Sequence, residues 1–407
     1  MHKRLVLHFF LLFTPILLAQ NKMSFESVDS ITYRQYINNE WDSLIAVGKM
    51  AFNNNIDFKY LRQRVGYAYF MKADYYASQK HYEKALLFDK KDVNSLTYLY
   101  YCGLYTANET YTRYREGFLP QELKTQFKIK PFKIVSSFDL EYNYKINNSL
   151  VRGNPTYQRA GLATDLGYRL NLYQSVSTYS QQNDSSNIKQ NEYFALMNWA
   201  VTPHLSVACG YHYLKSNVDE IYSYKTYVQG PHNSTIVYKT TDTISVGLAG
   251  HVFFSKLNYN LSRFNFGLTG SIMNYDSVST QQLGLQASVT LPGKLNTYLK
   301  TSVYGIFDSS NNNRLIVSQT VGALLSPKLW IEGSVLLGNQ KLFTDHNGLY
   351  IYNSIDPTTF RAGLTAFFKI VPKTSLYINY SFDNKLIEYN QTNYNQHSFS
   401  GGIIWKI

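Results

Sequence analysis

Charged residues and cysteines are scarce in this chain of 407 residues, and after residue 20 it has no apolar run of the length that a membrane-spanning helix needs. Charged residues make up 16% of the chain, against roughly 25% in an ordinary soluble protein, which indicates a surface that water does not fully cover. The missing apolar runs exclude a bundle of membrane helices. They do not exclude a β-barrel, whose strands hide their hydrophobicity in alternation. The two cysteines, Cys102 and Cys209, fall in different predicted modules, so we expect no disulfide between them.

Sequence motifs of common enzymes and metalloproteins are also missing. The nine histidines show no metal-ligand spacing, and no Gly-rich phosphate loop, Gly-x-Ser-x-Gly turn or zinc-protease helix occurs. We therefore expect no catalytic, metal or cofactor site, and a protein that is not an enzyme. One alternative stays open: a lipid hydrolase or acyl transferase of the outer membrane that uses Ser206 with His212 or His251.

Aromatic residues are abundant, and positive charges outnumber negative ones. The chain contains 37 tyrosines and 24 phenylalanines, and its formal net charge is +12. A positive charge of this size would fit a nucleic-acid-binding protein if the basic residues were clustered. Lysine and arginine are instead scattered and form no dense run beyond the N-terminus. We therefore expect no binding of nucleic acid.

Residues 1–19 have the three parts of a secretory signal peptide. Residues 2–4 are basic, residues 5–18 are almost all apolar, and Ala19 precedes a polar segment. The apolar run is short for an uncleaved membrane anchor, which is the alternative interpretation. We therefore predict cleavage after Ala19 and export of the mature chain.

Residues 25–125 are predicted to form a small helical module. Between Tyr60 and Asp92 apolar residues recur at helical spacing, and large, small and aromatic residues alternate there in a fixed order: Val65, Gly66, Tyr69, Tyr75, Ser78, Tyr82 and Ala85. This order resembles one tetratricopeptide repeat, a helix-turn-helix unit of about 34 residues. Residues 25–58 resemble an earlier, divergent copy, and a third copy begins near Val93. Such a module either binds a peptide or another partner in its groove, or serves as a plug or spacer before the next domain.

Residues 130–407 are predicted to form a transmembrane antiparallel β-barrel. From Lys133 to Lys145 mostly apolar residues alternate with polar ones, which is the pattern of a strand between lipid and water. The alternation recurs in rows that begin at Leu205, Phe264, Leu283 and Phe360. A soluble β-sandwich or propeller is the alternative fold, but it does not explain loops that are long on one side only.

Short turns and long polar loops alternate between the predicted strands. Proline cannot donate a hydrogen bond within a sheet, and it marks four short turns, at Pro203, Pro292, Pro327 and Pro372. Two turns without proline are expected at residues 169–172 and 255–257. Long loops are expected at residues 147–156, 182–190, 217–240, 309–313, 344–359 and 385–396. Asp345 and His346 should be solvated in one of them. The scheme gives about 14 strands, with 12 as the alternative. With an even number, the first strand starts and the last strand finishes on the same side of the membrane, which we expect to be the periplasm.

The chain ends on a strand-like segment with a polar residue, a glycine and two large apolar residues, namely Ser400, Gly402, Trp405 and Ile407. This combination resembles the insertion signal of bacterial outer-membrane proteins, although the terminal Ile407 stands where that signal most often has phenylalanine. The resemblance implies recognition by the barrel-assembly machinery and contact of the last strand with outer-membrane lipid.

Helical repeats followed by a barrel resemble the YaiO-type outer-membrane proteins and similar barrels of Bacteroidetes, a Gram-negative group. The resemblance implies transport, export or assembly at the outer membrane, with an unknown substrate and with the helical module in the periplasm. It also implies a periplasmic protein or polysaccharide as the partner of that module. The alternatives are a structural barrel with a filled lumen and the lipid-modifying enzyme considered above.

Overall fold

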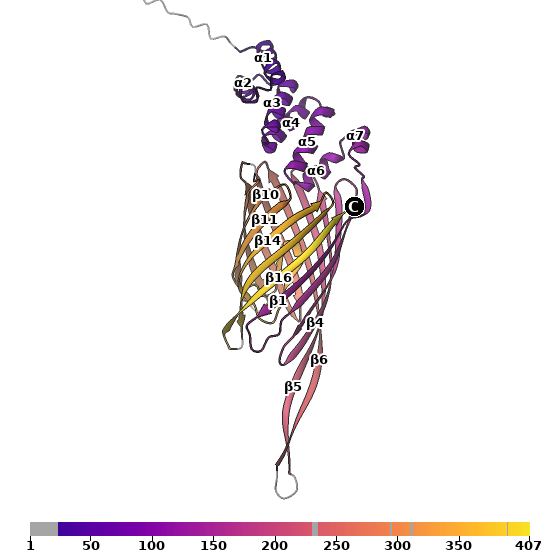
Figure 1. Ribbon diagram of the computed structural model, residues 1–407, viewed down its shortest axis with the longest axis vertical. Helices are drawn as coiled ribbons and strands as arrows, with labels where there is room; N and C mark the ends of the chain where they lie inside the picture. The colour runs from indigo at the N-terminus through magenta and orange to yellow at the C-terminus, as the bar shows by residue number, and fades with distance from the viewer. Residues whose placement is uncertain (1–22, 230–234, 294, 310–311, 389) are drawn as a thin grey trace, which may run out of the picture.

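The computed structural model describes residues 23–407 except 230–234, 294, 310–311 and 389. It consists of a helical module near the N-terminus and a β-barrel formed by the rest of the chain (Figure 1). The expected signal peptide, residues 1–19, lies outside the described residues. Within them, no helix is both long and apolar enough to cross a membrane.

The helical module contains seven α-helices in the described part of the chain. They are α1 (Phe25–Ile37), α2 (Trp41–Asn53), α3 (Lys59–Met71), α4 (Tyr75–Phe88), α5 (Val93–Tyr105), α6 (Glu109–Glu116) and α7 (Gln121–Gln126). The helices α1, α3 and α5 each begin 34 residues after the one before, and so do α2, α4 and α6. The module is therefore a stack of helix pairs with a 34-residue period, and α7 leads into the barrel.

Caps and small residues explain where these helices begin and how closely they pack. The side chains of Asp74, Asp92 and Asn108 each accept a hydrogen bond from the backbone N–H three residues later, at the starts of α4, α5 and α6. A Cβ atom at Gly66 would lie 3.0 Å from the ring of Tyr82, so glycine lets α3 and α4 approach each other. Of the packing positions singled out in the sequence, the structure buries Val65, Gly66, Ser78, Tyr82 and Ala85, and it partly buries Tyr69 and Tyr75.

Fourteen strands of the described chain close into one antiparallel barrel, which confirms the predicted fold class. They are β1 (Phe132–Asn147), β2 (Thr156–Leu166), β3 (Leu170–Gln182), β4 (Ser186–Ala200), β5 (Leu205–Gln229), β6 (Thr235–Leu261), β7 (Phe264–Tyr275), β8 (Val278–Thr290), β9 (Tyr298–Asp308), β10 (Arg314–Ser326), β11 (Leu329–Leu337), β14 (Thr358–Val371), β15 (Thr374–Ile387) and β16 (Thr392–Lys406). The strands follow one another around the barrel in chain order. The first and last strands, β1 and β16, pair with Phe138 opposite Trp405 and so close the barrel.

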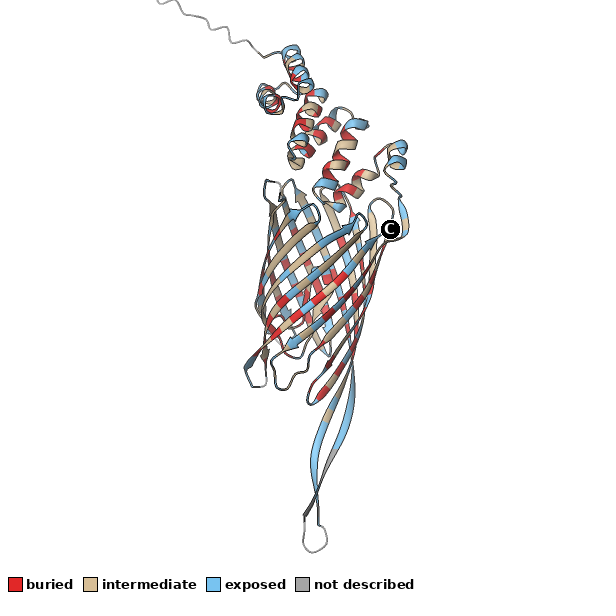
Figure 2. Ribbon diagram, in the orientation of Figure 1, coloured by how far each residue is buried: buried red, intermediate tan, exposed pale blue. Residues whose placement is uncertain are grey.

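The two faces of the strands differ in polarity, as the alternation predicts. On β1, Ile134, Leu140 and Tyr142 are exposed on the outside, whereas Asp139 and Glu141 are buried on the inside. Exposed and buried residues alternate along the strands in Figure 2. Other strands expose large apolar side chains in the same way, among them Phe266, Leu285 and Leu364. A closed barrel leaves no unpaired strand edge, so its apolar outer surface fits the hydrocarbon core of a membrane.

Short turns lie at the end of the barrel that faces the helical module, and most of the longer connections lie at the other end. We call these the turn end and the loop end. The four turns predicted from proline are confirmed: they join β4 to β5, β8 to β9, β10 to β11 and β14 to β15. The turn expected at residues 169–172 does join β2 to β3, but it lies at residues 167–169, because β3 already begins at Leu170.

Several predicted turns and loops are wrong. Residues 255–257 lie inside β6, and the chain reverses instead at Ser262, whose φ is 54°. Residues 182–190 are mostly strand, because β3 ends at Gln182 and β4 begins at Ser186. A tight turn at Asp276 and Ser277, with φ of 45° and 64°, joins β7 to β8. It was not predicted because it lacks the glycine that usually marks a two-residue turn with positive φ.

The described residues of the long loop expected at residues 217–240 belong instead to two paired strands. Past Glu220, the last residue of β5 that pairs with β4, strand β5 continues beside β6 with Ile221 opposite Thr243 and Gln229 opposite Thr235, and this two-stranded ribbon projects from the loop end (Figure 1). Tyrosine and threonine are frequent in this segment and favour strands. The prediction of a loop relied on the polar composition of this segment. Cross-strand hydrogen bonds hold it as a ribbon instead.

Candidate functional site

The connection between β11 and β14 folds back into the barrel, whereas the sequence predicts a solvated loop there. Residues 338–357 form β12 (Phe343–Asp345), the short 3-10 helix η2 (His346–Gly348) and β13 (Tyr350–Tyr352), and their side chains contact the inner wall. We call residues 338–357 the inward loop. Its first residue, Gly338, has a φ of 115°, and a Cβ atom there would lie 2.3 Å from the carbonyl oxygen of Leu315. Only glycine fits this position, from which the chain turns inward.

Apolar side chains of the inward loop fix it to the wall. Leu342 packs against β5, β6 and β7, Phe343 against β9, β10 and β11, and Leu349 against β4, β5 and β6. Phe343 is completely buried and Leu342 is nearly so. Full burial of one such side chain contributes roughly 1.5–3 kcal/mol. The loop is therefore held inside the lumen by several kcal/mol of apolar contact with strands far away in the sequence.

Polar contacts hold both halves of the inward loop. The amide of Gln282 on β8 binds the backbone of Thr344 twice: its Nε2 donates to the carbonyl at 2.9 Å, and its Oε1 accepts from the N–H at 3.0 Å. Near the loop end, Arg152 forms a two-pronged ion pair with Asp356, at 2.7 and 2.9 Å, and both side chains are almost fully buried. Paired hydrogen bonds of this kind fix an orientation as well as a position.

His212 on β5 connects the tip of the inward loop to the wall. Its Nδ1 lies 2.9 Å from the carbonyl oxygen of Gly348, and its Nε2 lies 3.3 Å from Oε2 of Glu192 on β4. Both ring nitrogens therefore face oxygen atoms, one in the inward loop and one in the wall. Gly348 has a φ of 88°, and a Cβ atom there would lie 3.1 Å from Phe254, so glycine is needed for this close approach.

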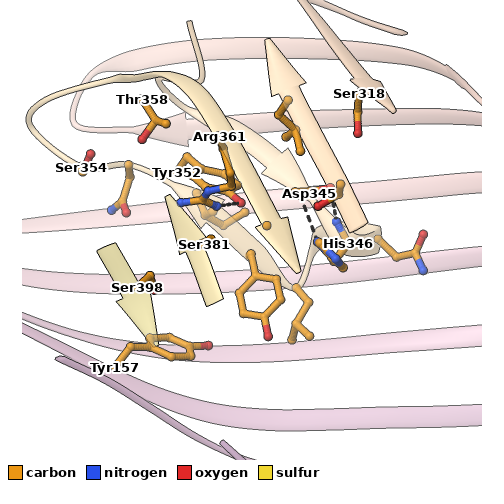
Figure 3. Close-up of a pocket in the computed structure, with 18 of the residues that line it drawn as sticks. Tyr157, Ser318, Asp345, His346, Tyr352, Ser354, Thr358, Arg361, Ser381 and Ser398 are labelled. Carbon is orange, nitrogen blue, oxygen red and sulfur yellow. Dashed lines mark hydrogen bonds and ion pairs between the residues drawn. The ribbon is translucent and has the colours of Figure 1, made fainter. Parts of the chain in front are cut away.

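The rest of the lumen is a cavity of about 1410 Å³ that passes beside the inward loop. Its lining includes Thr110 of α6 and Ser206 near the turn end, and Tyr394 near the loop end. Figure 3 shows part of it, with Arg361 of β14 pointing toward Tyr352 of the loop, whose hydroxyl accepts a hydrogen bond from it. The cavity therefore extends along the barrel, and the inward loop narrows it from several sides, because Tyr350 contacts Glu141 on β1 while Phe343 packs against β9 to β11.

The sequence prediction for Asp345 and His346 is partly wrong. The two residues line the cavity, and Nδ1 of His346 lies 3.0 Å from Oδ2 of Asp345 (Figure 3). The imidazole is well exposed, as expected, but the carboxylate is only 14% exposed because the loop turns it toward the wall.

Charged side chains of the wall fall into two groups. One group forms buried ion pairs: Arg159 with Asp139 at 2.5 Å and with Glu141 at 2.8 Å, and Arg361 with Asp383. The second group consists of lysines that line the cavity and form no ion pair with a carboxylate in the described part of the chain, namely Lys145, Lys256, Lys300 and Lys385. The ion pairs stiffen the wall. Lys256 donates to Asn347, and the buried Lys385 donates to Ser354 and Thr358, whereas Lys145 and Lys300 are the more accessible of the four to a solute in the cavity.

The helical module rests on one side of the turn end. Arg113 of α6 forms an ion pair with Asp165 at 2.6 Å and donates to the carbonyl of Gly167, at the turn between β2 and β3. Asp74, at the start of α4, pairs with Arg263 of the turn between β6 and β7 at 2.7 Å. These contacts attach the helices to the rim of the barrel beside its opening.

Glu83 of α4 is the centre of the contact between the module and the turn that joins β4 to β5. Its Oε1 accepts hydrogen bonds from Tyr111 at 2.8 Å and from Arg115 at 2.9 Å, and it lies 3.2 Å from Nε2 of His204. Burial alone raises the pKa of Glu83, but the hydrogen bond from His204 and the charge of Arg115 outweigh burial and lower the pKa to about 2. The hydrogen bond with Glu83 raises the pKa of His204.

The residues of the predicted insertion signal lie on both faces of β16. Ser400 is buried on the inside and accepts a hydrogen bond from Asn143, and the ring of Tyr377 covers Gly402. Trp405 and Ile407 are about half exposed. The strand therefore presents its large apolar residues outward and its small ones to the lumen.

The structure does not bring together the residues of the enzyme alternative. Ser206 and His212 lie on one strand, six positions apart, which is a separation of about 20 Å at the rise of a β-strand. His251 points outward, where Tyr211 contacts it at 2.8 Å. No group of three or more His, Cys, Asp or Glu side chains able to hold a metal ion is found among the described residues.

Comparison with known proteins finds no matching family model and no matching curated protein. Solved structures that match include a Pseudomonas aeruginosa FadL homologue, at 9% identity over 72% of this chain and 92% of that one, with a TM-score of 0.45. The Ralstonia pickettii toluene transporter TbuX matches at 9% identity over 68% and 90%, with a TM-score of 0.46. The P. putida toluene transporter TodX matches at 7% identity over 68% and 91%, also with a TM-score of 0.46. These similarities assign neither family nor substrate.

Proposed function

We propose that the chain is an outer-membrane channel that transports a solute, and that the inward loop restricts the passage. The observation that carries the proposal is the cavity that runs along the lumen beside the loop. A structural barrel with a filled lumen would not need this space. The lining combines tyrosine and amide side chains with lysines, which suits a polar solute.

We further propose that the turn end and the helical module lie in the periplasm. Outer-membrane barrels have short turns on the periplasmic side and longer loops outside the cell. Here the turns marked by proline, the start of β1, the last residues of β16 and the helices all lie at the turn end of the barrel. This arrangement supports the proposed orientation.

The resemblance to YaiO-type proteins with tetratricopeptide-like repeats is likewise a proposal. The 34-residue period of the helix pairs supports it, because that period is typical of this repeat. The orientation of β16, with Trp405 and Ile407 outward, supports recognition by the barrel-assembly machinery and contact with outer-membrane lipid.

The experiment that tests the channel is single-channel recording of the full chain in planar bilayers, with and without the inward loop. The backbone N–H of Gln340 donates to the carbonyl of Thr358 at 2.8 Å, so β11 and β14 are adjacent there. An Asn-Gly turn can therefore replace residues 341–357. We expect conductance from the natural chain and a several-fold larger conductance from the shortened one.

Two controls make the result specific. The first control is a variant that lacks residues 222–242. It shortens the ribbon, which lies outside the lumen, and should conduct like the natural chain. Gel migration with and without boiling shows whether each variant forms a closed barrel. If folded barrels with and without the inward loop all fail to conduct, the structural barrel is the correct interpretation.

A further inference from the structure

The inner face of the helical module carries a second cavity, remote from the lumen. It has a volume of about 390 Å³, within the range of small-molecule sites, and it lies between α1, α3 and α5, with one side chain from α4. Its described lining is Asp29, Tyr33, Tyr36, Tyr60, Gln63, Arg64, Tyr67, Tyr82, Asn94 and Tyr98. We call this cavity the tyrosine groove. Six of these ten residues are tyrosines and none is aliphatic.

Four of the six tyrosines of the groove form a continuous row of rings. The centroids of Tyr36 and Tyr67 are 5.3 Å apart, and those of Tyr67 and Tyr98 are 5.5 Å apart, both pairs edge to face. Tyr98 in turn stacks on Tyr82, with centroids 4.9 Å apart and planes 3° from parallel. Successive helix pairs thus each contribute a ring, and the rings support one another in fixed orientations.

The hydroxyl of Tyr82 has no hydrogen-bond partner in the described structure, although the side chain is completely buried. Buried polar atoms are almost always paired, and an orphan hydroxyl at a cavity wall favours any ligand that can pair with it. This is the observation that distinguishes the groove from a mere packing gap between helices.

The polar groups that line the groove carry no net charge in the described lining. Asp29 and Arg64 are the charged residues of the described lining, and they form an ion pair with each other at 2.7 Å. Gln63 donates from Nε2 to Asp92 and Ser95, which leaves its oxygen as an acceptor. Asn94 is exposed at the edge of the groove. Amide groups and phenolic hydroxyls remain to bind a ligand.

These features select the chemistry of the occupant. Tyrosine rings pack against flat C–H faces, and amides and hydroxyls pair with alcohol groups at the edges of the same ligand. A sugar ring presents both kinds of surface. A peptide with aliphatic or acidic anchor residues would need aliphatic pockets or an unpaired cation, and the described lining supplies neither.

We infer that the tyrosine groove is a binding site for a neutral polysaccharide chain. The inference does not rest on the channel function, because the groove belongs to the helices and the lumen belongs to the barrel. Each can therefore fail without the other.

The test is calorimetric titration of the purified full chain, in a detergent without a sugar headgroup, with three neutral oligosaccharides: cellohexaose, chitohexaose and maltohexaose. We expect saturable binding of at least one. Tyr82→Phe removes the buried hydroxyl and keeps the ring, and it should weaken binding about five- to tenfold. Tyr67→Ala interrupts the row of rings and should abolish measurable binding.

The matched control is Tyr105→Phe. Tyr105 stacks on Tyr75 outside the groove, so the same loss of a hydroxyl should leave the affinity unchanged. Helical circular dichroism identifies any variant that unfolds, and because Tyr82→Phe preserves the packing, it keeps the test valid if Tyr67→Ala does not fold. The inference is overturned if no oligosaccharide binds the natural chain, or if Tyr82→Phe and Tyr105→Phe bind equally well.

Discussion

At His212 the two ring nitrogens face two acceptors that belong to different parts of the molecule, the carbonyl of Gly348 in the inward loop and the carboxylate of Glu192 in the wall. The side chain is only 1% exposed. Replacing His212 by phenylalanine would remove a polar partner from the carbonyl of Gly348 and from the carboxylate of Glu192. Leaving a buried polar group without its partner costs about 1–3 kcal/mol.

We therefore predict that His212→Phe loosens the inward loop and raises the mean conductance and the current noise of the channel. The control is His251→Phe, on the neighbouring strand β6, where the side chain points outward. Planar-bilayer recording of both variants checks the prediction. Equal current traces for the two would show that His212 does not hold the loop.

Single residues also show which parts of the site the sequence could reveal. Gly66 and Tyr82 stand in one short helical hairpin, so their close packing follows from local spacing. Gly348 gave no such signal. Its positive φ and its contact with Phe254 arise only after about a hundred intervening residues have placed β6 beside the loop. The sequence also could not show that the hydroxyl of Tyr82 is unpaired, because pairing depends on which hydrogen-bonding groups the neighbouring helices place beside it.

At the scale of elements, the close packing of α3 against α4 can be tested by a substitution. We predict that Gly66→Leu destabilises the helical module by roughly 1–3 kcal/mol, because the added side chain must displace the ring of Tyr82. Thermal unfolding followed by helical circular dichroism should show an earlier loss of helix. Lys84→Leu, an exposed position on α4, adds the same side chain without a clash. A shared melting temperature for the two variants would contradict the proposed close approach of α3 and α4.

Strands and turns were predictable to different degrees for a physical reason. Alternation is local, so β1 and the rows of β7, β8 and β14 could be found from the sequence, and proline marks its turns directly. The ribbon and the inward loop depend on pairing between segments. Residues 217–240 and 338–357 are similarly polar, yet the first pairs with itself outside the barrel and the second packs against strands β4 to β11 inside it.

For the whole molecule, the attachment of the helices to the barrel should depend on pH. Attachment raises the pKa of His204 above its ordinary value of 6.5 through the hydrogen bond with Glu83, so the protonated form favours the attached state. This contribution is complete below pH 6.5 and is lost as the pH rises through the raised pKa. Glu83 works in the opposite direction: its pKa falls from 4.5 to about 2, so its contribution is complete above pH 4.5 and is lost as the pH falls toward 2. Attachment should therefore be strongest between these limits.

Electron spin resonance can measure this dependence as a distance between the two modules. Labels at Lys84→Cys on α4 and Lys328→Cys at the turn end, with Cys209→Ser to remove an exposed thiol, report the position of the helices relative to the rim. We expect a narrow distance distribution near about pH 5.5 and a broader one once the pH has risen through the raised pKa of His204. Added His204→Gln should remove the change, because glutamine keeps a hydrogen-bond donor but no titrating charge. The ion pairs of Arg113 and Arg263 persist at both pH values, so the helices should loosen without detaching. Complete detachment at the higher pH would mean that the contact between Glu83 and His204 carries the whole attachment, and no change at all would mean that it carries none of it.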